Sequence, residues 1–107
     1  MVSTPFFVWQ NKKLLCIDAE NVMFLDTRGN YTRIVYYDKT CDEVQVSLVT
    51  ALKKFPPGMF IQIHRSYAVS IHYIKKISND TVEVEGEELP IGNKYYQDLI
   101  NKLTIID

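Results

Sequence analysis

The sequence lacks the features that would place it in a membrane or mark it as a nucleotide-binding protein. It has no apolar run approaching the roughly 18 residues that cross a membrane as a helix, and no basic segment precedes an apolar core at its N-terminus. Glycine occurs only four times in 107 residues and never in a cluster, which excludes a glycine-rich phosphate-binding loop. We therefore expect a cytoplasmic chain that makes no contact with a membrane.

Neither sign of charge is in excess. The 12 basic and 13 acidic residues give a formal net charge of −1, so the chain as a whole has no electrostatic attraction for nucleic acid. The charges are unevenly placed, however, because glutamates crowd the segment from Glu83 to Glu88 while Arg28, Arg33 and Arg65 lie outside it. Nucleic-acid binding would therefore depend on where the basic side chains lie.

Cysteine and histidine are too few and too scattered for a catalytic or metal site. Cys16 and Cys41 belong to no CxxC pattern, and His64 and His72 have no neighbouring cysteine, which argues against zinc. A catalytic Cys–His pair is also unsupported, because neither cysteine lies in a nucleophile elbow and no third group is evident that would orient the histidine. We expect two buried free thiols, no metal, no cofactor and no enzymatic activity.

The residues that are present indicate a single mainly-β domain over residues 1–107. A chain of this length buries enough apolar surface to fold without a metal or a disulfide. The hydrophobic fraction is 47%, and seven Tyr, five Phe and many Val and Ile residues favour strands. Only two stretches have helical periodicity.

The order of elements is predicted to be strands, a short helix, more strands and a terminal helix. Ser47 caps the first helix, whose apolar stripe is Leu48, Leu52 and Phe55. Gly92-Asn93 opens the last helix. This order lacks the strand–helix alternation of a parallel nucleotide-binding sheet. Outside the segment 60–77, strands are expected at residues 6–10, 13–17, 22–26, 31–37, 43–46, 81–84 and 88–91.

Three polar residues interrupt the most core-like part of the chain. Residues 60–77 alternate apolar and polar positions like a half-buried strand, but His64, Arg65 and Ser66 occur together within it. Arginine and serine are side chains that bind phosphates and read base edges. The alternative is structural, with His64 satisfied in the core and Arg65 paired with a carboxylate.

Two further polar clusters have the same character. Arg28, Asn30, Thr32 and Arg33 surround a predicted turn, and Asn93-Lys94 stands at the head of the last helix, where free N–H groups attract anions. A β scaffold that presents loops to DNA needs such clusters at the ends of its strands and helices. Composition alone leaves the structural and DNA-binding interpretations open.

Several short motifs follow one another in an order typical of one protein family. They are Ile17–Asp26, Gly29–Thr32, Leu48–Leu52 with Phe55, Phe60–Val69, Ile74 and Leu89–Tyr95. Together, and centred on His64-Arg-Ser-Tyr67, they resemble the LytTR DNA-binding domain, the output module of LytR/AlgR-type bacterial response regulators. The resemblance covers about residues 13–103.

The resemblance implies an elongated β-β-β sandwich of short strands, with one short central helix and a C-terminal helix. It also implies transcription regulation, with loops inserted into two successive major grooves of double-stranded DNA and homodimers on promoter repeats. In this reading His64 holds its loop by hydrogen bonds and Arg65 is offered to DNA. The candidate DNA-binding residues are Arg28, Asn30, Tyr31, Thr32, Arg33, His64, Arg65, Ser66, Asn93 and Lys94.

The sequence departs from the family pattern where positive charge is usual. Gln62 replaces a common Arg or Lys, Ser70 replaces Asn, and Gly92-Asn93 replaces a common Ser-Arg. These changes predict weaker DNA binding. They also leave open an alternative function, a small protein-interaction module derived from the same fold.

A response regulator also needs a phosphoacceptor receiver domain, and the sequence contains none. The chain is therefore either a stand-alone LytTR protein or the excised output domain of a longer protein with a receiver or sensor domain. Residues 1–5 fit a natural start and a domain boundary equally well.

Overall fold

The computed structural model describes residues 6–107, so the first five residues of the expected domain lie outside the described part. The chain there forms short strands, two α-helices and two 3-10 helices. In chain order they are β1 (Phe6–Gln10), β2 (Lys13–Ile17), η1 (Ala19–Asn21), β3 (Val22–Arg28), β4 (Tyr31–Tyr36), β5 (Cys41–Val44), α1 (Leu48–Leu52), β6 (Phe60–His64), β7 (Tyr67–Ser70), η2 (Ile71–Tyr73), β8 (Lys76–Ile77), β9 (Thr81–Val84), β10 (Glu87–Pro90) and α2 (Asn93–Asn101).

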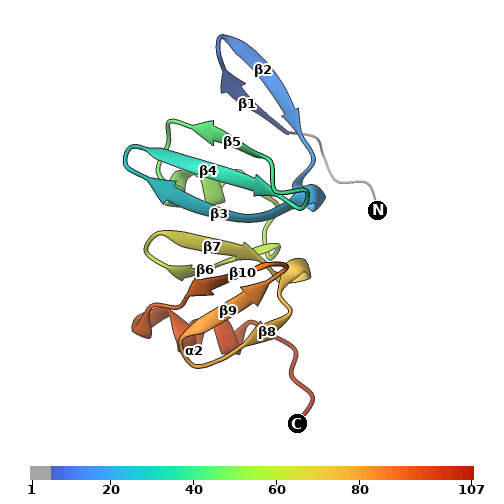
Figure 1. Cartoon of the computed structure of the whole chain (residues 1–107), viewed down its shortest axis with the longest axis vertical. Helices are drawn as coiled ribbons and strands as arrows, with labels where there is room; N and C mark the ends of the chain where they lie inside the picture. Colours follow the sequence, from blue (N-terminus) through green and yellow to red (C-terminus); the bar gives the residue numbers. More distant parts are fainter. Residues whose placement is uncertain (1–5) are drawn as a thin grey trace.

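These strands form antiparallel sheets that follow one another along the long axis of the molecule (Figure 1). The β1–β2 hairpin lies at one end, a five-stranded sheet of order β5-β4-β3-β7-β6 lies in the middle, and a sheet of order β10-β9-β8 lies at the other end with α2. The molecule measures 47 × 35 × 24 Å. The expected mainly-β, elongated arrangement of three β layers with a short central helix and a C-terminal helix is confirmed.

The middle sheet is buried on both faces. Phe24 and Val69, paired across β3 and β7, belong to the core shared with β8–β10 and α2. Their neighbours Leu25 and Ala68 belong to a second core, shared with α1 and the base of the hairpin. Because successive strand residues point to opposite faces, β3 needs an apolar residue at nearly every position, which accounts for its continuous apolar run.

The two helices begin and pack as the sequence predicts. The Ser47 hydroxyl accepts a hydrogen bond from the Thr50 N–H at 3.1 Å and so caps α1. Leu48 and Phe55 are buried, and Leu52 is half-buried against the same core. Leu99 on α2 is fully buried. Helix α2 thus closes the core at the C-terminal end of the molecule.

The prediction that Cys16 and Cys41 are buried is wrong, because both thiols are exposed. Cys16 lies on the outward face of the hairpin, and Cys41 begins β5, the edge strand of the middle sheet. The predicted strand 43–46 is displaced as well. A tight turn, closed by the Tyr36 N–H donating to the Thr40 carbonyl at 2.8 Å, starts β5 at Cys41.

We expect Leu99→Ala to lower the free energy of unfolding by about 2–5 kcal/mol, because it opens a cavity at a fully buried site. Urea denaturation followed by circular dichroism measures the loss. Gln97→Ala on the exposed face of the same helix is the control and should change stability by less than about 0.5 kcal/mol. Equal effects of both substitutions would show that α2 is not part of the core.

Candidate nucleic-acid interface

The three polar clusters come together along one edge of the molecule. The β3–β4 turn, the β6–β7 turn and the start of α2 follow one another down the left edge in Figure 1. Backbone hydrogen bonds connect them, since the Thr27 N–H donates to the Ser66 carbonyl at 3.0 Å and the Gly92 N–H donates to the Ile63 carbonyl at 2.8 Å. Segments more than 60 residues apart in the chain therefore form a single surface, which we call the loop edge.

The β3–β4 turn exposes three of the candidate side chains. Gly29 has φ of +61°, a conformation that glycine adopts without strain, and so allows a two-residue turn with Asn30. Arg28, Asn30 and Tyr31 are exposed around it. Gly29, Asn30, Tyr31 and Arg65 line a common hollow of about 460 Å³, together with residues of the β5–α1 connection. The first two clusters therefore share one concave surface.

The β6–β7 turn is held by its own side chains. The Ser66 N–H donates to Nδ1 of His64 at 3.0 Å, so this nitrogen is the unprotonated one and the proton of the neutral ring lies on Nε2. The Gln62 amide donates to the His64 carbonyl at 3.1 Å. The His64 ring also packs edge-on against Tyr67, with centroids 5.7 Å apart. His64 thus has the holding role expected of it.

Arg65 stands exposed at the tip of this turn. Within residues 6–107, the ion pairs that arginines make involve Arg28 and Arg33, not Arg65. The alternative in which Arg65 pairs with a carboxylate is therefore wrong for the described part of the chain. Among the described residues, Arg65 is therefore an unpaired cation on a fixed turn.

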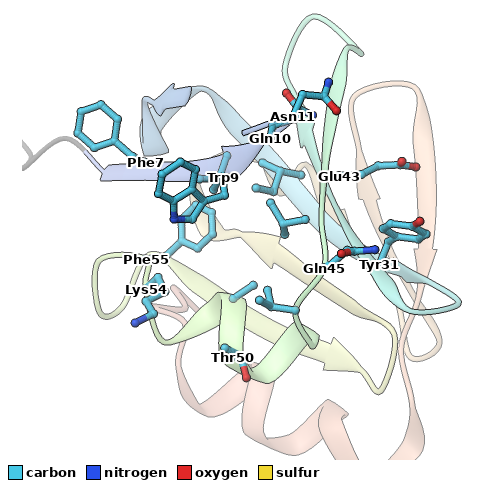
Figure 2. Close-up of a pocket in the computed structure, with 15 residues that line it drawn as sticks. Phe7, Trp9, Gln10, Asn11, Tyr31, Glu43, Gln45, Thr50, Lys54 and Phe55 are labelled. Carbon is cyan, nitrogen blue, oxygen red and sulfur yellow. The ribbon is translucent and has the colours of Figure 1, made fainter. Parts of the chain in front are cut away.

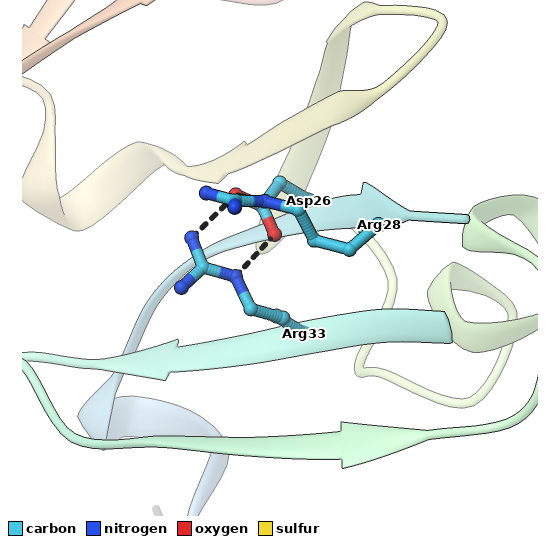
Figure 3. A network of polar contacts seen from close by, with 3 residues as sticks. All are labelled: Asp26, Arg28 and Arg33. Atoms are coloured by element: carbon cyan, nitrogen blue, oxygen red, sulfur yellow. Dashed lines mark hydrogen bonds and ion pairs between the residues drawn. The ribbon is translucent and has the colours of Figure 1, made fainter. Parts of the chain in front are cut away.

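Arg33 and Thr32 are engaged by the protein itself. Arg33 donates to both carboxylate oxygens of Asp26, through Nε at 2.8 Å and a terminal nitrogen at 2.7 Å (Figure 3). These hydrogen bonds raise the pKa of the Arg33 guanidinium. Thr32 is fully buried, and its hydroxyl donates to the Val46 carbonyl at 2.7 Å. The structure does not bring these two side chains to the loop edge.

Arg28 contacts the same carboxylate from the other side, but much more loosely. Its Nε lies 3.8 Å from Asp26, and 62% of its side chain is exposed, against 24% for Arg33. The Asp26 carboxylate, only 3% exposed, thus holds one arginine in the structure and leaves the other facing solvent. The sequence alone predicts DNA contacts for both arginines and does not distinguish them.

The start of α2 completes the loop edge. Asn93 and Lys94 are exposed, and the Lys94 ammonium lies 5.3 Å from the centroid of the Tyr95 ring. The N-cap residue is Gly92, and no side chain within residues 6–107 caps the helix. The first N–H groups of α2 are therefore open to an anion.

A group of acidic residues lies on the opposite side. The β9–β10 turn, with Glu85 and Glu87 exposed, lies at the right edge in Figure 1, where the Lys39 ammonium lies over Gly86. The formal net charge of −1 therefore does not describe the loop edge, which carries Arg28, Arg65 and Lys94.

Other kinds of site receive no support from the described residues. Within residues 6–107, no three His, Cys, Asp or Glu side chains are placed to hold a metal ion. None of the helices in that range has the length and apolar character needed to cross a membrane.

Comparison with known families gives this surface a context. The family model of the LytTr DNA-binding domain matches residues 12–104. The chain belongs to the LytTR family. The matched range agrees with residues 13–103, the range expected from the sequence resemblance, and it includes all three clusters of the loop edge. LytTR is a family of DNA-binding domains rather than of enzymes.

Two similar proteins agree with the assignment of this chain to the LytTR family. A sensory transduction protein, LytT of Bacillus subtilis, is 27% identical over 100 residues, which cover 88% of this chain but 41% of that protein. The chain thus spans about two fifths of its curated relative. A solved LytTr DNA-binding domain from Bacillus cereus superimposes with a TM-score of 0.80 at 20% identity, covering 97% of this chain and 100% of that one. The fold is therefore the LytTR fold.

We expect Arg33→Ala to lower the free energy of unfolding by about 3–5 kcal/mol, because the buried Asp26 carboxylate loses its main partner. Arg28→Ala removes the exposed contact to the same carboxylate and should cost about 0–1 kcal/mol. Urea midpoints of the two variants measure the difference. Equal losses would contradict the structural role assigned to Arg33.

Proposed function

We propose that this LytTR domain is the sequence-specific output domain of a bacterial transcription regulator and binds double-stranded DNA through the loop edge. The observation that carries the proposal is Arg65, which has no ion-pair partner within residues 6–107 and stands on a turn fixed by His64 and Gln62, between two other exposed polar clusters. A side chain on a rigid turn loses less conformational freedom when it binds a base or phosphate.

Contact with two successive major grooves is part of this proposal, because the loop edge runs along the long axis of the molecule (Figure 1). The grooves recur about every 34–36 Å along B-DNA, and the long axis of the domain is 47 Å. Arg28, Asn30 and Tyr31 would enter one groove, and Asn93 and Lys94 the next. Arg65 would lie near the centre of the site, where it contacts phosphate or a base edge.

The candidate side chains that make hydrogen bonds within the protein have supporting roles in this proposal. His64 and Ser66 shape the central turn, and Thr32 and Arg33 anchor the strand that follows the first loop. We further propose that the domain acts as a homodimer on promoter repeats, under the control of a receiver or sensor domain in the full-length protein.

We expect Arg65→Ala to weaken binding to a promoter fragment with tandem repeats by about 1–3 kcal/mol, while the urea midpoint stays unchanged. A gel-shift titration measures the affinity. Lys76→Ala, which removes one exposed positive charge from β8, is the matched control and should bind almost as the parent does. Unfolding of the Arg65 variant would instead indicate a structural role.

The salt dependence of binding is expected to be shallow. With about four phosphates neutralised per domain, the logarithm of the binding constant should fall with the logarithm of salt concentration at a slope of about −4. Titrations at several salt concentrations give this slope. Absence of binding at both low and moderate salt would favour the protein-interaction module instead.

A further inference from the structure

The outward face of the β1–β2 hairpin is apolar and open to solvent. Phe7 pairs with Cys16, and Trp9 pairs with Leu14, so these four side chains share one face of the hairpin. The exposed fractions are 53% for Phe7, 68% for Trp9 and 55% for Leu14, and Cys16 is exposed as well. The face contains no ionisable carboxylate or ammonium group. We call these four residues the hairpin face.

The hairpin is attached to the domain through its opposite side. Val8 packs against the core beneath the middle sheet, and Ile17 is 2% exposed. Both belong to the alternate set of positions, which points away from the hairpin face. The hairpin face is therefore not needed to hold the hairpin in place. A concentrated, exposed apolar surface of this kind marks an interaction site.

The apolar surface continues past the edge of the hairpin. A groove of about 990 Å³ lies between β1, the end of β5 and α1. In Figure 2 the Trp9 ring extends over this groove toward Phe55, and Phe7 is also among the residues that line it. A partner that covers Trp9 would therefore also cover the mouth of the groove.

We propose that the hairpin face is a homodimer interface, in which two copies of this chain pack their hairpins face to face about a two-fold axis. A two-fold interface uses the same patch on both copies, and an uncharged apolar patch can meet itself without repulsion. The hairpin face would serve the homodimer proposed above, but association through it does not depend on DNA binding.

The charges at the two ends of the hairpin favour this occupant and set its orientation. Lys12 and Lys13 are exposed at the tip, and Asp18 and Glu20 are exposed at the base. In an antiparallel two-fold arrangement, the basic tip of each copy meets the acidic base of the other. The complementarity is present within a single chain, as a second copy requires.

The available area fits a weak dimer. A whole aromatic side chain offers about 150–250 Å², so the exposed parts of Phe7 and Trp9 amount to roughly 250 Å². With Leu14, Cys16 and the polar ends of the hairpin, two copies would bury roughly 1,000 Å² in total, the lower limit for a specific interface. We therefore expect association at micromolar concentrations.

Trp9 makes the interface directly observable, because it is the only tryptophan of the chain. Raising the concentration of the 107-residue protein through the micromolar range, without DNA, should double its mass in sedimentation. It should shift the tryptophan emission to shorter wavelength over the same range. Under the same conditions the Cys16 thiol should become protected from labelling while Cys41, outside the hairpin face, stays reactive.

Leu14→Lys retains Trp9 as the fluorescent probe and should abolish both the mass increase and the emission shift. Val49→Lys on α1, where the parent side chain is 52% exposed, is the matched control and should leave both unchanged. A protein that stays monomeric at all concentrations overturns the proposal. So does a dimer that persists in Leu14→Lys, since it would use another surface.

A charge exchange tests the orientation. Lys12→Glu, in the turn at the tip, and Glu20→Lys, at the base, should each weaken association several-fold, and the double variant should regain it, because the two sites face each other across the axis. A double variant as weak as the single ones would overturn the antiparallel arrangement. Because no DNA is present, failure here is distinguishable from failure of the proposed DNA binding.

Discussion

The middle sheet must be buried on both faces, and the rest of the molecule follows from this requirement. Phe24 and Leu25 are neighbours in β3, yet they enter different cores, so an additional layer has to cover each face. The third sheet with α2 covers one face, and α1 with the base of the hairpin covers the other. Polar side chains then find room mainly where the strands end. The loop edge is the result: a surface made of turns, on a framework that leaves little other space for exposed polar side chains.

Asp26 is a buried charged residue in this apolar sheet, and it gives the three arginines of the chain different roles. A carboxylate with 2% exposure is stable only if its charge is compensated. Arg33 supplies the compensation in a bidentate hydrogen bond. Arg28 therefore makes only a loose contact with Asp26 and stays exposed, and Arg65 has no carboxylate partner among the described residues. Arg33 thus keeps β3 and β4 in register, next to the β3–β4 turn that exposes Arg28.

Local patterns in the sequence predicted most of the fold. The Ser47 cap and the strands 6–10 and 13–17 are set by neighbouring residues, and each was located correctly. The difference between Arg28 and Arg33 depends on register, which local chemistry does not reveal. A two-residue turn at Gly29-Asn30 does place Asp26 opposite Arg33, so counting across the hairpin could have found the pair. The exposure of Cys16 depends on which face of a two-stranded hairpin is covered, and that is a property of the whole molecule.

The positions of Arg65 and of the β9–β10 turn also place opposite charges at two edges of the molecule. Arg28, Arg65 and Lys94 lie along the loop edge and Glu85 and Glu87 lie at the opposite edge, while the formal net charge of the chain is −1. In the field of a polyanion, such a molecule experiences a torque more than a net pull. It would turn its basic side toward DNA on approach, while its low net charge limits adhesion to unrelated sequences. Orientation during the encounter is thus built into the charge distribution before any specific contact forms.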